Sequence, residues 1–420
     1  MSATAAEPSK PDSGAIANEA YHEATGGRIT EARDWQASVY DRLSDPEHDA
    51  GFLLLAPSAS GKTEAVLVPS LGLKRLGGPR HVFIIGADGS PLDDIVLRVT
   101  PHLKSWVESD QTSRTIYIDG DDTGPDGNAV RFEPDGTVDT DISISPLEAD
   151  VDVVVTTFGR FLDLFFGSGG VHGLPSALPL PHETEVRRDL FFFDEAQSYN
   201  SVQFSQFLRL VEFLFAEDTD IVVASSTMSP GFEEELSFLE KITVPGDPPP
   251  VKLTYRAEAD AIAALAAEAA KVDLSNGRTA IVVETAAQAD ALLSQLSPTL
   301  QQSALRYLPG AKPEQRRKDY AVLLAKTEPY LLITTGSYLE NSNLDFDTVM
   351  STLCLPESLI LRAGRCNRYT RATEGTIVVL GQSLEGTQRV LNKAQQSGYL
   401  EALAACDGAA FDPSAWKAFI

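Results

Sequence analysis

The sequence predicts an α/β protein built on two parallel sheets in tandem, and two observations lead to this fold class. Short apolar runs rich in β-branched and aromatic residues alternate with segments of helical pattern. Strands that are apolar throughout are buried on both faces, as in a parallel sheet covered by helices. The same alternation restarts after a proline-rich stretch near the middle of the chain, which predicts a second sheet.

The predicted strands follow this alternation in order along the chain. In the first half they are residues 51–56, 81–86, 114–120, 151–157, 189–195 and 220–225. In the second half an alanine-rich helix, residues 257–271, comes first, and the predicted strands are residues 279–285, 330–336, 347–353 and 375–381.

The composition of the chain also predicts its domain boundaries. Residues 1–27 are rich in Ala, Ser, Pro, Glu and Gly without periodicity, which is typical of a flexible tail. Residues 28–243 form the predicted first lobe, residues 244–253 a linker with three successive prolines, and residues 254–420 the second lobe. Within the first lobe, residues 119–150 are dense in Asp and Gly and predict a hairpin or a solvated acidic insertion.

The charge balance restricts the class of function. The chain has 34 Lys and Arg against 60 Asp and Glu, a formal net charge of −26. This argues against a protein that is basic over its whole surface, but it permits a local basic cleft. No run approaches the roughly 18 to 20 apolar residues that cross a bilayer, and the N-terminus lacks a signal-peptide pattern. We therefore expect a cytoplasmic protein without membrane association. Three cysteines without CxxC spacing support neither disulfides nor a zinc site.

The strongest local motif is the segment 56–63, APSASGKT, which follows a predicted strand and precedes a predicted helix. It is a Walker A loop with alanine at the usual first glycine. In such a loop, backbone N–H groups at the helix N-terminus bind phosphate oxygens, Lys62 reaches the β and γ phosphates, and the Thr63 hydroxyl ligates Mg²⁺. The predicted nucleotide-binding residues of this segment are Ser58, Ala59, Ser60, Gly61, Lys62, Thr63 and Glu64.

A second motif, DEAQ at residues 194–197, follows the aromatic run of the 189–195 strand. Ligands of parallel α/β sheets bind at this carboxyl end of the strands. We expect Asp194 to hold Mg²⁺ with Thr63, and Glu195 to deprotonate the water that attacks the γ phosphate. Gln197 belongs to the same predicted catalytic group. The implied reaction is hydrolysis of ATP.

A third motif, LRAGRCNR at residues 361–368, places arginines at a spacing of three. Arg362, Arg365 and Arg368 would therefore fall near one face of a helix. Such a face can stabilise the charge that develops on a γ phosphate. A solvated basic helix end is the alternative interpretation of this run taken alone.

Taken together, these motifs resemble the superfamily 2 DExD/H-box helicases. The segment RAGRCNR, together with DEAQ and the downstream LDFD, is most similar in sequence to the CRISPR-associated helicases of type I interference systems. The resemblance covers roughly residues 30 to 380 and implies two RecA-like lobes with the nucleotide cleft between them. Arg365 and Arg368 match the family's finger pair, Arg362 belongs to the same nucleotide-contacting motif, and Gln36 occupies the position of the adenine-reading glutamine.

The resemblance also implies contacts with the nucleic-acid strand. Thr156 and Thr157 match the family's strand-contacting TT segment, and Thr335 and Ser337 match a segment that contacts both nucleic acid and nucleotide. Three positions depart from the family pattern: Leu361 replaces a glutamine, Asn343 an aspartate and Ser226 an alanine. The hydrolytic residues are intact.

The function predicted from the sequence is an ATP-dependent helicase or translocase on single-stranded DNA that acts in CRISPR type I interference. The six histidines are scattered, so we expect an HD-type nuclease to be a separate protein, together with a CRISPR effector complex as partner. ATP and Mg²⁺ are the predicted cofactors. Two alternatives remain open at this point: an ATP-gated binding scaffold with little unwinding, and an RNA-remodelling DExD/H ATPase.

Overall fold

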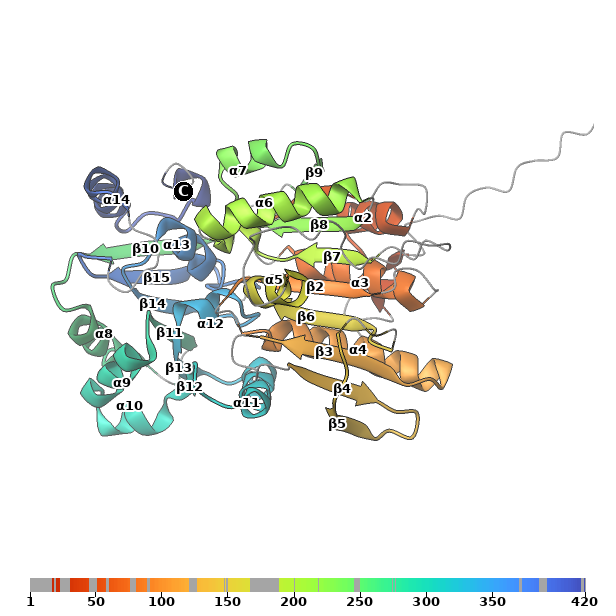
Figure 1. Ribbon diagram of the computed structural model, residues 1–420. Helices are drawn as coiled ribbons and strands as arrows, with labels where there is room; N and C mark the ends of the chain where they lie inside the picture. The colour runs from red at the N-terminus through yellow and green to blue at the C-terminus, as the bar shows by residue number, and fades with distance from the viewer. Residues whose placement is uncertain are drawn as a thin grey trace, which may run out of the picture.

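The protein consists of two α/β lobes that lie side by side, each with its own sheet (Figure 1). The structure is a computed structural model of the chain. It describes residues 17–18, 20–22, 31–44, 51–57, 60–75, 81–88, 91–120, 127–146, 148, 150–166, 189–199, 201–217, 219–244, 250–273, 275, 277–369, 372–384, 391–416 and 419. Most of the predicted N-terminal tail lies outside these residues.

Lobe 1 is a nine-stranded sheet in the order β5-β4-β3-β6-β2-β7-β8-β1-β9. Neighbouring strands are parallel except at one edge, where β4 pairs antiparallel with both β3 and β5. The strands are β1 (Gly51–Leu55), β2 (Val82–Gly86), β3 (Arg114–Asp119), β4 (Asn128–Phe132), β5 (Val138–Ile142), β6 (Val153–Thr157), β7 (Leu190–Phe193), β8 (Asp220–Ser225) and β9 (Glu240–Thr243).

Helices cover both faces of this sheet. They are α2 (Asp34–Ser44), α3 (Lys62–Arg75), α4 (Asp93–Asp110), α5 (Phe158–Phe166), the short 3₁₀ helix η1 (Ala196–Ser198), α6 (Ser201–Ala216) and α7 (Pro230–Glu235). Strand β7 shows why helices must pack on both faces of the sheet. Phe192 packs into the apolar cluster on one face, whereas Phe191 and Phe193 pack into the cluster on the other. Each buried phenylalanine contributes roughly 1.5–3 kcal/mol through the apolar surface it removes from water.

Lobe 2 is a six-stranded, fully parallel sheet in the order β10-β15-β14-β11-β13-β12. Its strands are β10 (Val251–Arg256), β11 (Arg278–Val283), β12 (Leu305–Tyr307), β13 (Tyr330–Thr335), β14 (Thr348–Thr352) and β15 (Gly375–Leu380). Its helices are α8 (Ala261–Ala269), α9 (Ala286–Gln295), α10 (Pro298–Ser303), α11 (Pro313–Ala325), α12 (Gly336–Glu340), α13 (Pro356–Ala363), α14 (Lys393–Ala405) and α15 (Pro413–Trp416).

The predicted fold class is confirmed, because two sheets dominated by parallel pairs divide the chain. Each predicted strand coincides with a strand of the structure. One boundary differs: residues 251–253, assigned to the linker, are the first residues of β10, since they pair with β15. The acidic segment 119–150 contains the antiparallel strands β4 and β5, which form a hairpin, the first of the two predicted alternatives, and extend the sheet of lobe 1.

The two lobes meet through α4 of lobe 1 and α11 of lobe 2 (Figure 1). Leu97 of α4 packs against the apolar cluster of lobe 2. Within the described residues, no helix combines the length and the apolar character that a bilayer crossing requires.

Candidate functional site

The Walker segment and the DEAQ segment meet in space because the strands that carry them are parallel and share one neighbour. Strand β8 pairs with β1 on one side and with β7 on the other, so the carboxyl ends of all three lie at one edge. Helix α3 begins at Lys62, directly after the loop that follows β1. Gly61 adopts φ +90°, a conformation that favours glycine. Ser58 and Ala59 lie outside the described residues.

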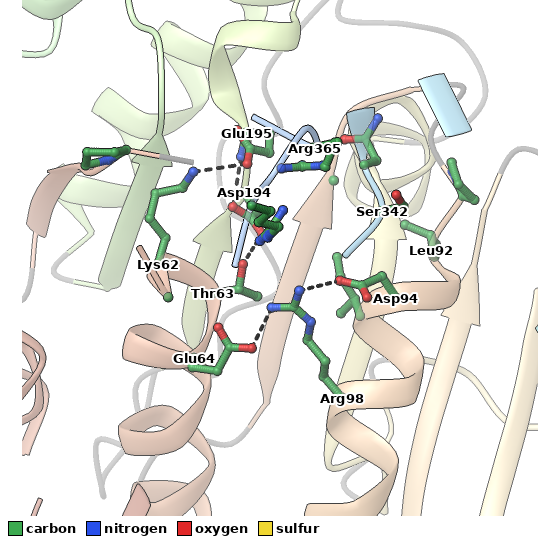
Figure 2. Close-up of a pocket in the computed structure, with 17 residues that line it drawn as sticks. Lys62, Thr63, Glu64, Leu92, Asp94, Arg98, Asp194, Glu195, Ser342 and Arg365 are labelled. Carbon is green, nitrogen blue, oxygen red and sulfur yellow. Dashed lines mark hydrogen bonds and ion pairs between the residues drawn. The ribbon is translucent and has the colours of Figure 1, made fainter. Parts of the chain in front are cut away.

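Two hydrogen bonds join the Walker residues to the carboxylates of the DEAQ segment (Figure 2). The Lys62 ammonium lies 3.0 Å from Oε1 of Glu195, and both side chains are largely buried. The Thr63 hydroxyl donates to Oδ2 of Asp194 at 3.0 Å. The predicted partners therefore lie together, and the cation that would bind phosphate is paired with the predicted base.

The backbone of Glu195 is held in an unusual conformation. Its φ of +54° lies in the left-handed region, which costs a non-glycine residue on the order of 1–3 kcal/mol. Several contacts hold it there: the Glu195 amide donates to Asp194 at 3.0 Å, the Ser226 hydroxyl donates to Oε2 of Glu195 at 3.3 Å, and the Gln197 amide also donates to Oε2. Gln197 in turn accepts from the Ser225 hydroxyl at 2.6 Å. Gln197 thus acts on Glu195, and it does not line the cavity described below.

The two adjacent carboxylates have pKa values that are shifted in opposite directions. Burial raises the pKa of Asp194, and the negative charge of Glu195 raises it further. Burial also acts to raise the pKa of Glu195, but the positive charges of Lys62 and Arg365 outweigh it and lower that pKa below the usual range. Glu195 is therefore a carboxylate at neutral pH, and its charge depends on the nearby cations.

Lobe 2 supplies Arg365 (Figure 2) to the same site, and Arg368 lines it as well. Burial and the adjacent Arg368 lower the pKa of Arg365 to about 10. Arg365 donates to the carbonyl oxygens of Leu339 and Glu340. In Arg368, Nε and Nη1 are buried and have no hydrogen-bond partner among the described residues. Unsatisfied guanidinium donors of this kind are suited to bind an anion.

The prediction that Arg362, Arg365 and Arg368 lie near one face of a helix is wrong. Helix α13 ends at Ala363 and Gly364 follows it, so Arg365 and Arg368 lie in the segment after the helix, near Asn367 with its φ of +53°. Arg362 is on the helix and is 1% exposed. Its guanidinium pairs with Glu284 at 2.9 Å and with Glu340 at 2.7 Å, both within lobe 2. This placement argues against the predicted contact between Arg362 and the nucleotide.

These groups surround a cavity between the lobes with a volume of about 60 Å³. Its lining residues are Pro57, Gly61, Lys62, Thr63, Glu64, Gly86, Pro91, Leu92, Asp94, Ile95, Arg98, Asp194, Glu195, Asn341, Ser342, Arg365 and Arg368. Within it, Lys62 pairs with Glu195, and Arg98 pairs with Glu64 and Asp94. A polyphosphate entering it would replace the carboxylates as the partner of the cations.

A second cavity of about 750 Å³ shares Gly61, Glu64, Asp94, Arg98 and Arg368 with the first. This volume is within the range of roughly 300–1,000 Å³ that is usual for small-molecule sites.

Gln36 lines the larger cavity, but both ends of its amide are already engaged. Nε2 of Gln36 donates to the Gly61 carbonyl at 3.3 Å, and Oε1 accepts from the Arg33 amide at 3.0 Å. Ser60 also lines this cavity, and its carbonyl accepts from Arg33 at 2.6 Å. Reading of a base by Gln36 would require its amide to exchange partners.

Two residues of α4 belong to the site although no motif predicts them. Arg98 lies between two carboxylates, with Nη1 2.7 Å from Glu64 and Nη2 2.7 Å from Asp94 (Figure 2). The i, i+4 spacing of Asp94 and Arg98 is visible in the sequence. Such pairs are common on exposed helix faces, however, so the spacing alone does not indicate a site.

The oxygens of Thr63 and Asp194 suit a magnesium ion. Mg²⁺ takes hard oxygen ligands in an octahedron with bonds of roughly 2.1 Å, so neighbouring ligand oxygens are about 3 Å apart. Oγ1 of Thr63 and Oδ2 of Asp194 have this separation, 3.0 Å. Among the residues that the structure describes, no group of three or more His, Cys, Asp or Glu forms another metal site.

The predicted strand-contacting residues lie at the ends of β6 and β13. The Thr156 and Thr157 side chains are buried, and the Thr156 hydroxyl donates to the Asp119 carbonyl at 3.0 Å. Thr335 is buried as well, whereas Ser337, in the first turn of α12, is exposed. In this conformation Ser337 presents its side chain to solvent and the three threonines do not.

Comparison with known proteins gives structural matches only. No family model matches the sequence, and no curated protein does. The fold matches S. cerevisiae Dbp5 bound to RNA and ADP BeF3, with a TM-score of 0.61, 16% identity, and 93% of this chain and 91% of that chain covered. It also matches the DUF1998 helicase MrfA bound to DNA, with a TM-score of 0.62, 15% identity, and 97% of this chain and 56% of that chain covered. The match to T. fusca Cas3 has a TM-score of 0.59 and 18% identity, and covers 94% of this chain and 52% of that chain.

The chain shares the two-lobed α/β fold of these three solved structures. It spans about half the length of the MrfA and Cas3 chains. At these identities the likeness establishes the fold, and the residues of the site carry the functional argument.

Proposed function

We propose that the protein is an ATP-dependent helicase or translocase that acts on nucleic acid. One observation carries the proposal: Lys62, Thr63 and the two carboxylates of lobe 1 lie in one cavity with the arginines of lobe 2. Arg368 adds two buried donors without a partner in the described chain. A site divided between two lobes can link hydrolysis to their relative movement.

In the proposed reaction, the triphosphate draws Lys62 away from Glu195. Since Lys62 is the main charge that lowers the Glu195 pKa, its departure makes Glu195 a stronger base. Glu195 then takes the proton from the water that attacks the γ phosphorus, and ADP leaves. Arg365 and Arg368 stabilise the charge on the phosphoryl oxygens. When bound by Thr63 and Asp194, Mg²⁺ would neutralise charge on the β and γ phosphates.

For the nucleic acid, we propose single-stranded DNA, and a role in CRISPR type I interference with a separate HD-type nuclease and an effector complex in the cytoplasm. This part of the proposal is supported by the amino-acid sequences of the RAGRCNR, DEAQ and LDFD segments. RNA is the second candidate, because the Dbp5 structure that this fold matches contains RNA. An ATP-gated scaffold with little unwinding is the third, because Ser226 and Asn343 depart from the family pattern.

A hydrolysis assay with added nucleic acid tests the proposal. We expect single-stranded DNA to raise the rate of ATP hydrolysis several-fold, RNA to raise it less, and a tailed duplex to be separated. Lys62→Ala should abolish hydrolysis in all conditions. If nucleic acid does not raise the rate of ATP hydrolysis, or if Lys62→Ala still hydrolyses ATP, the proposed helicase or translocase activity is contradicted. Stimulation without strand separation would favour the scaffold.

A further inference from the structure

A buried polar cluster joins the two lobes, and none of the sequence motifs contains it. Asp93 lies in the first turn of α4 in lobe 1, and Arg316 lies on α11 of lobe 2. Nε of Arg316 donates to Oδ2 of Asp93, and Nη2 donates to Oδ1 at 3.3 Å. The two side chains are 3% and 1% exposed. This is a bidentate ion pair removed from solvent.

Tyrosines of lobe 2 complete the surroundings of the pair. The Tyr307 hydroxyl donates to Oδ2 of Asp93 at 3.0 Å, and Nη1 of Arg316 donates to the Tyr338 hydroxyl at 3.3 Å. The Arg316 guanidinium also lies 5.7 Å from the centre of the Tyr338 ring. A buried ion pair offsets its desolvation only when its remaining hydrogen-bonding groups are satisfied. Both charges here have several partners, which fixes their geometry.

A second set of hydrogen bonds and ion pairs, next to this cluster, leads to the cavity lined by Lys62 and Glu195. The Tyr320 hydroxyl of α11 donates to Oδ1 of Asp94 at 2.7 Å and accepts from the Asn343 amide at 2.6 Å. Asp94 also binds Arg98, which binds Glu64, the residue after Thr63. A continuous set of polar contacts therefore runs from α3 through α4 to α11 and the segment after α12.

We propose that the Asp93–Arg316 pair positions lobe 2 for hydrolysis by fixing the lobe orientation in which Arg365 and Arg368 reach the cavity. The inference rests on the proposed function of that cavity. Both arginines belong to lobe 2, so their distance from Lys62 depends on how the lobes are oriented. Misplacement of a reacting group by about 1 Å can cost on the order of 100-fold in rate.

The pair affects orientation more than folding, because each lobe has its own core. The apolar clusters of lobe 1 lie on either face of the β1–β9 sheet, and those of lobe 2 on either face of the β10–β15 sheet. Loss of the pair would leave each sheet and its helices in place. The lobes would then sample other relative orientations, and the arginines would meet the phosphates less often.

Steady-state hydrolysis by four variants tests the role of the pair. We expect Arg316→Met and Asp93→Asn each to lower kcat about tenfold or more, while KM for ATP stays within about threefold. The double variant should be no worse than the poorer single variant, because both remove the same contact. Arg316→Lys, which keeps the charge, should recover part of kcat.

Arg114→Met is the matched control, because it removes partly buried ion pairs to Asp110 and Asp152 within lobe 1. It should leave kcat within about twofold. The proposal is overturned if the interface variants keep the wild-type kcat, if their losses add in the double variant, or if Arg114→Met loses as much.

A distance measurement separates this proposal from the proposed function. Fluorescent labels are placed at Val202→Cys in lobe 1, 68% exposed, and Glu328→Cys in lobe 2, 79% exposed, with Cys406 replaced by serine. Arg316→Met should broaden the transfer-efficiency distribution of the nucleotide-free protein. An unchanged distribution overturns the positioning role. Absence of ATP hydrolysis in the wild type contradicts the proposed function, and the labels still report on the pair.

Discussion

At the scale of single residues, the site depends on Glu195 and the contacts that hold its left-handed backbone. Lys62, Gln197 and Ser226 all contact the Glu195 carboxylate. The carboxylate therefore has a fixed direction in a site whose charge balance changes when nucleotide enters. A substitution that keeps the shape of the side chain but removes its charge separates the chemical step from binding.

Glu195→Gln should lower the rate of ATP hydrolysis by roughly 10²–10⁴-fold, because the amide cannot take a proton from water. ATP binding should persist or tighten, since Lys62 loses its anionic partner. Single-turnover hydrolysis and equilibrium binding of Mg·ATP measure the two effects. Asp290→Asn, at an exposed surface ion pair of lobe 2, is the control and should change neither. A parallel loss of binding and hydrolysis would show that Glu195 has a structural role.

The sequence predicted the residues of the site that belong to local motifs. Lys62, Thr63, Asp194 and Glu195 each follow an apolar strand, so strand order brings them together. Asp94 and Arg98 were not predictable in this way, because their role arises from the packing of α4 against α3 and α11. The structure argues against the nucleotide contact predicted for Arg362 for a similar reason. Spacing along a helix does not reveal which side chains the lobe core buries.

At the scale of elements, Arg362 connects three parts of lobe 2. It lies on α13 and binds Glu284 after β11, Glu340 of α12 and the Ser351 hydroxyl of β14, the last at 2.6 Å. Gly336 lies against its guanidinium, where a Cβ atom would collide with Nη2. The arginine that resembled a nucleotide contact is thus a buried connection between elements.

Arg362→Met should therefore destabilise lobe 2 by about 3–5 kcal/mol, because it leaves two largely buried carboxylates without their cation. Urea unfolding followed by circular dichroism measures this change. Arg306→Met, which removes an exposed ion pair with Asp290, should cost about 0–1 kcal/mol. Unchanged stability in Arg362→Met together with weaker ATP binding would restore the nucleotide-contacting role.

Among the elements, the apolar strands were predictable, and the short edge strands β9 and β12 were not. Strands β2, β6 and β7 are buried throughout, so their sequences are continuous apolar runs. Strand β9 has four residues and is largely exposed, and β12 has three. Such short strands form because a neighbouring strand offers hydrogen bonds, so their own sequences carry little signal. For β4 and β5, at the edge next to β3, the sequence predicted a hairpin or a solvated insertion without deciding between them.

At the scale of the whole molecule, the net charge of −26 limits unassisted binding to nucleic acid. Four cationic side chains line the cavity between the lobes, but four carboxylates line it too: Lys62, Arg98, Arg365 and Arg368 against Glu64, Asp94, Asp194 and Glu195. The site itself is close to neutral before ligand enters. Attraction for the phosphates of a strand must then come from a few local contacts, because the surface as a whole repels them.

Binding of single-stranded DNA without partners should therefore be weak and should fall with salt. Each phosphate contact contributes a slope of about −0.7 to the plot of log K against log salt concentration. Fluorescence anisotropy with a labelled oligonucleotide between 50 and about 200 mM salt measures this slope. Tight binding of duplex DNA at the higher salt concentration would show that the acidic surface does not limit affinity.

Mg·ATP should stabilise the whole molecule, because in the proposed mechanism its phosphates would contact residues of both lobes. At a ligand concentration of about 100 times Kd, linkage predicts roughly 2.7 kcal/mol of added stability. Thermal unfolding should then shift upward by a few degrees with Mg·ATP and by less with ATP and chelator, since Asp194 and Thr63 would face the phosphates without the ion. Lys62→Ala should show no shift at the same ligand concentration.

ADP should stabilise less than ATP, because Arg365 and Arg368 lose the γ phosphate as their partner. An equal shift with ADP would indicate that lobe 2 takes no part in binding.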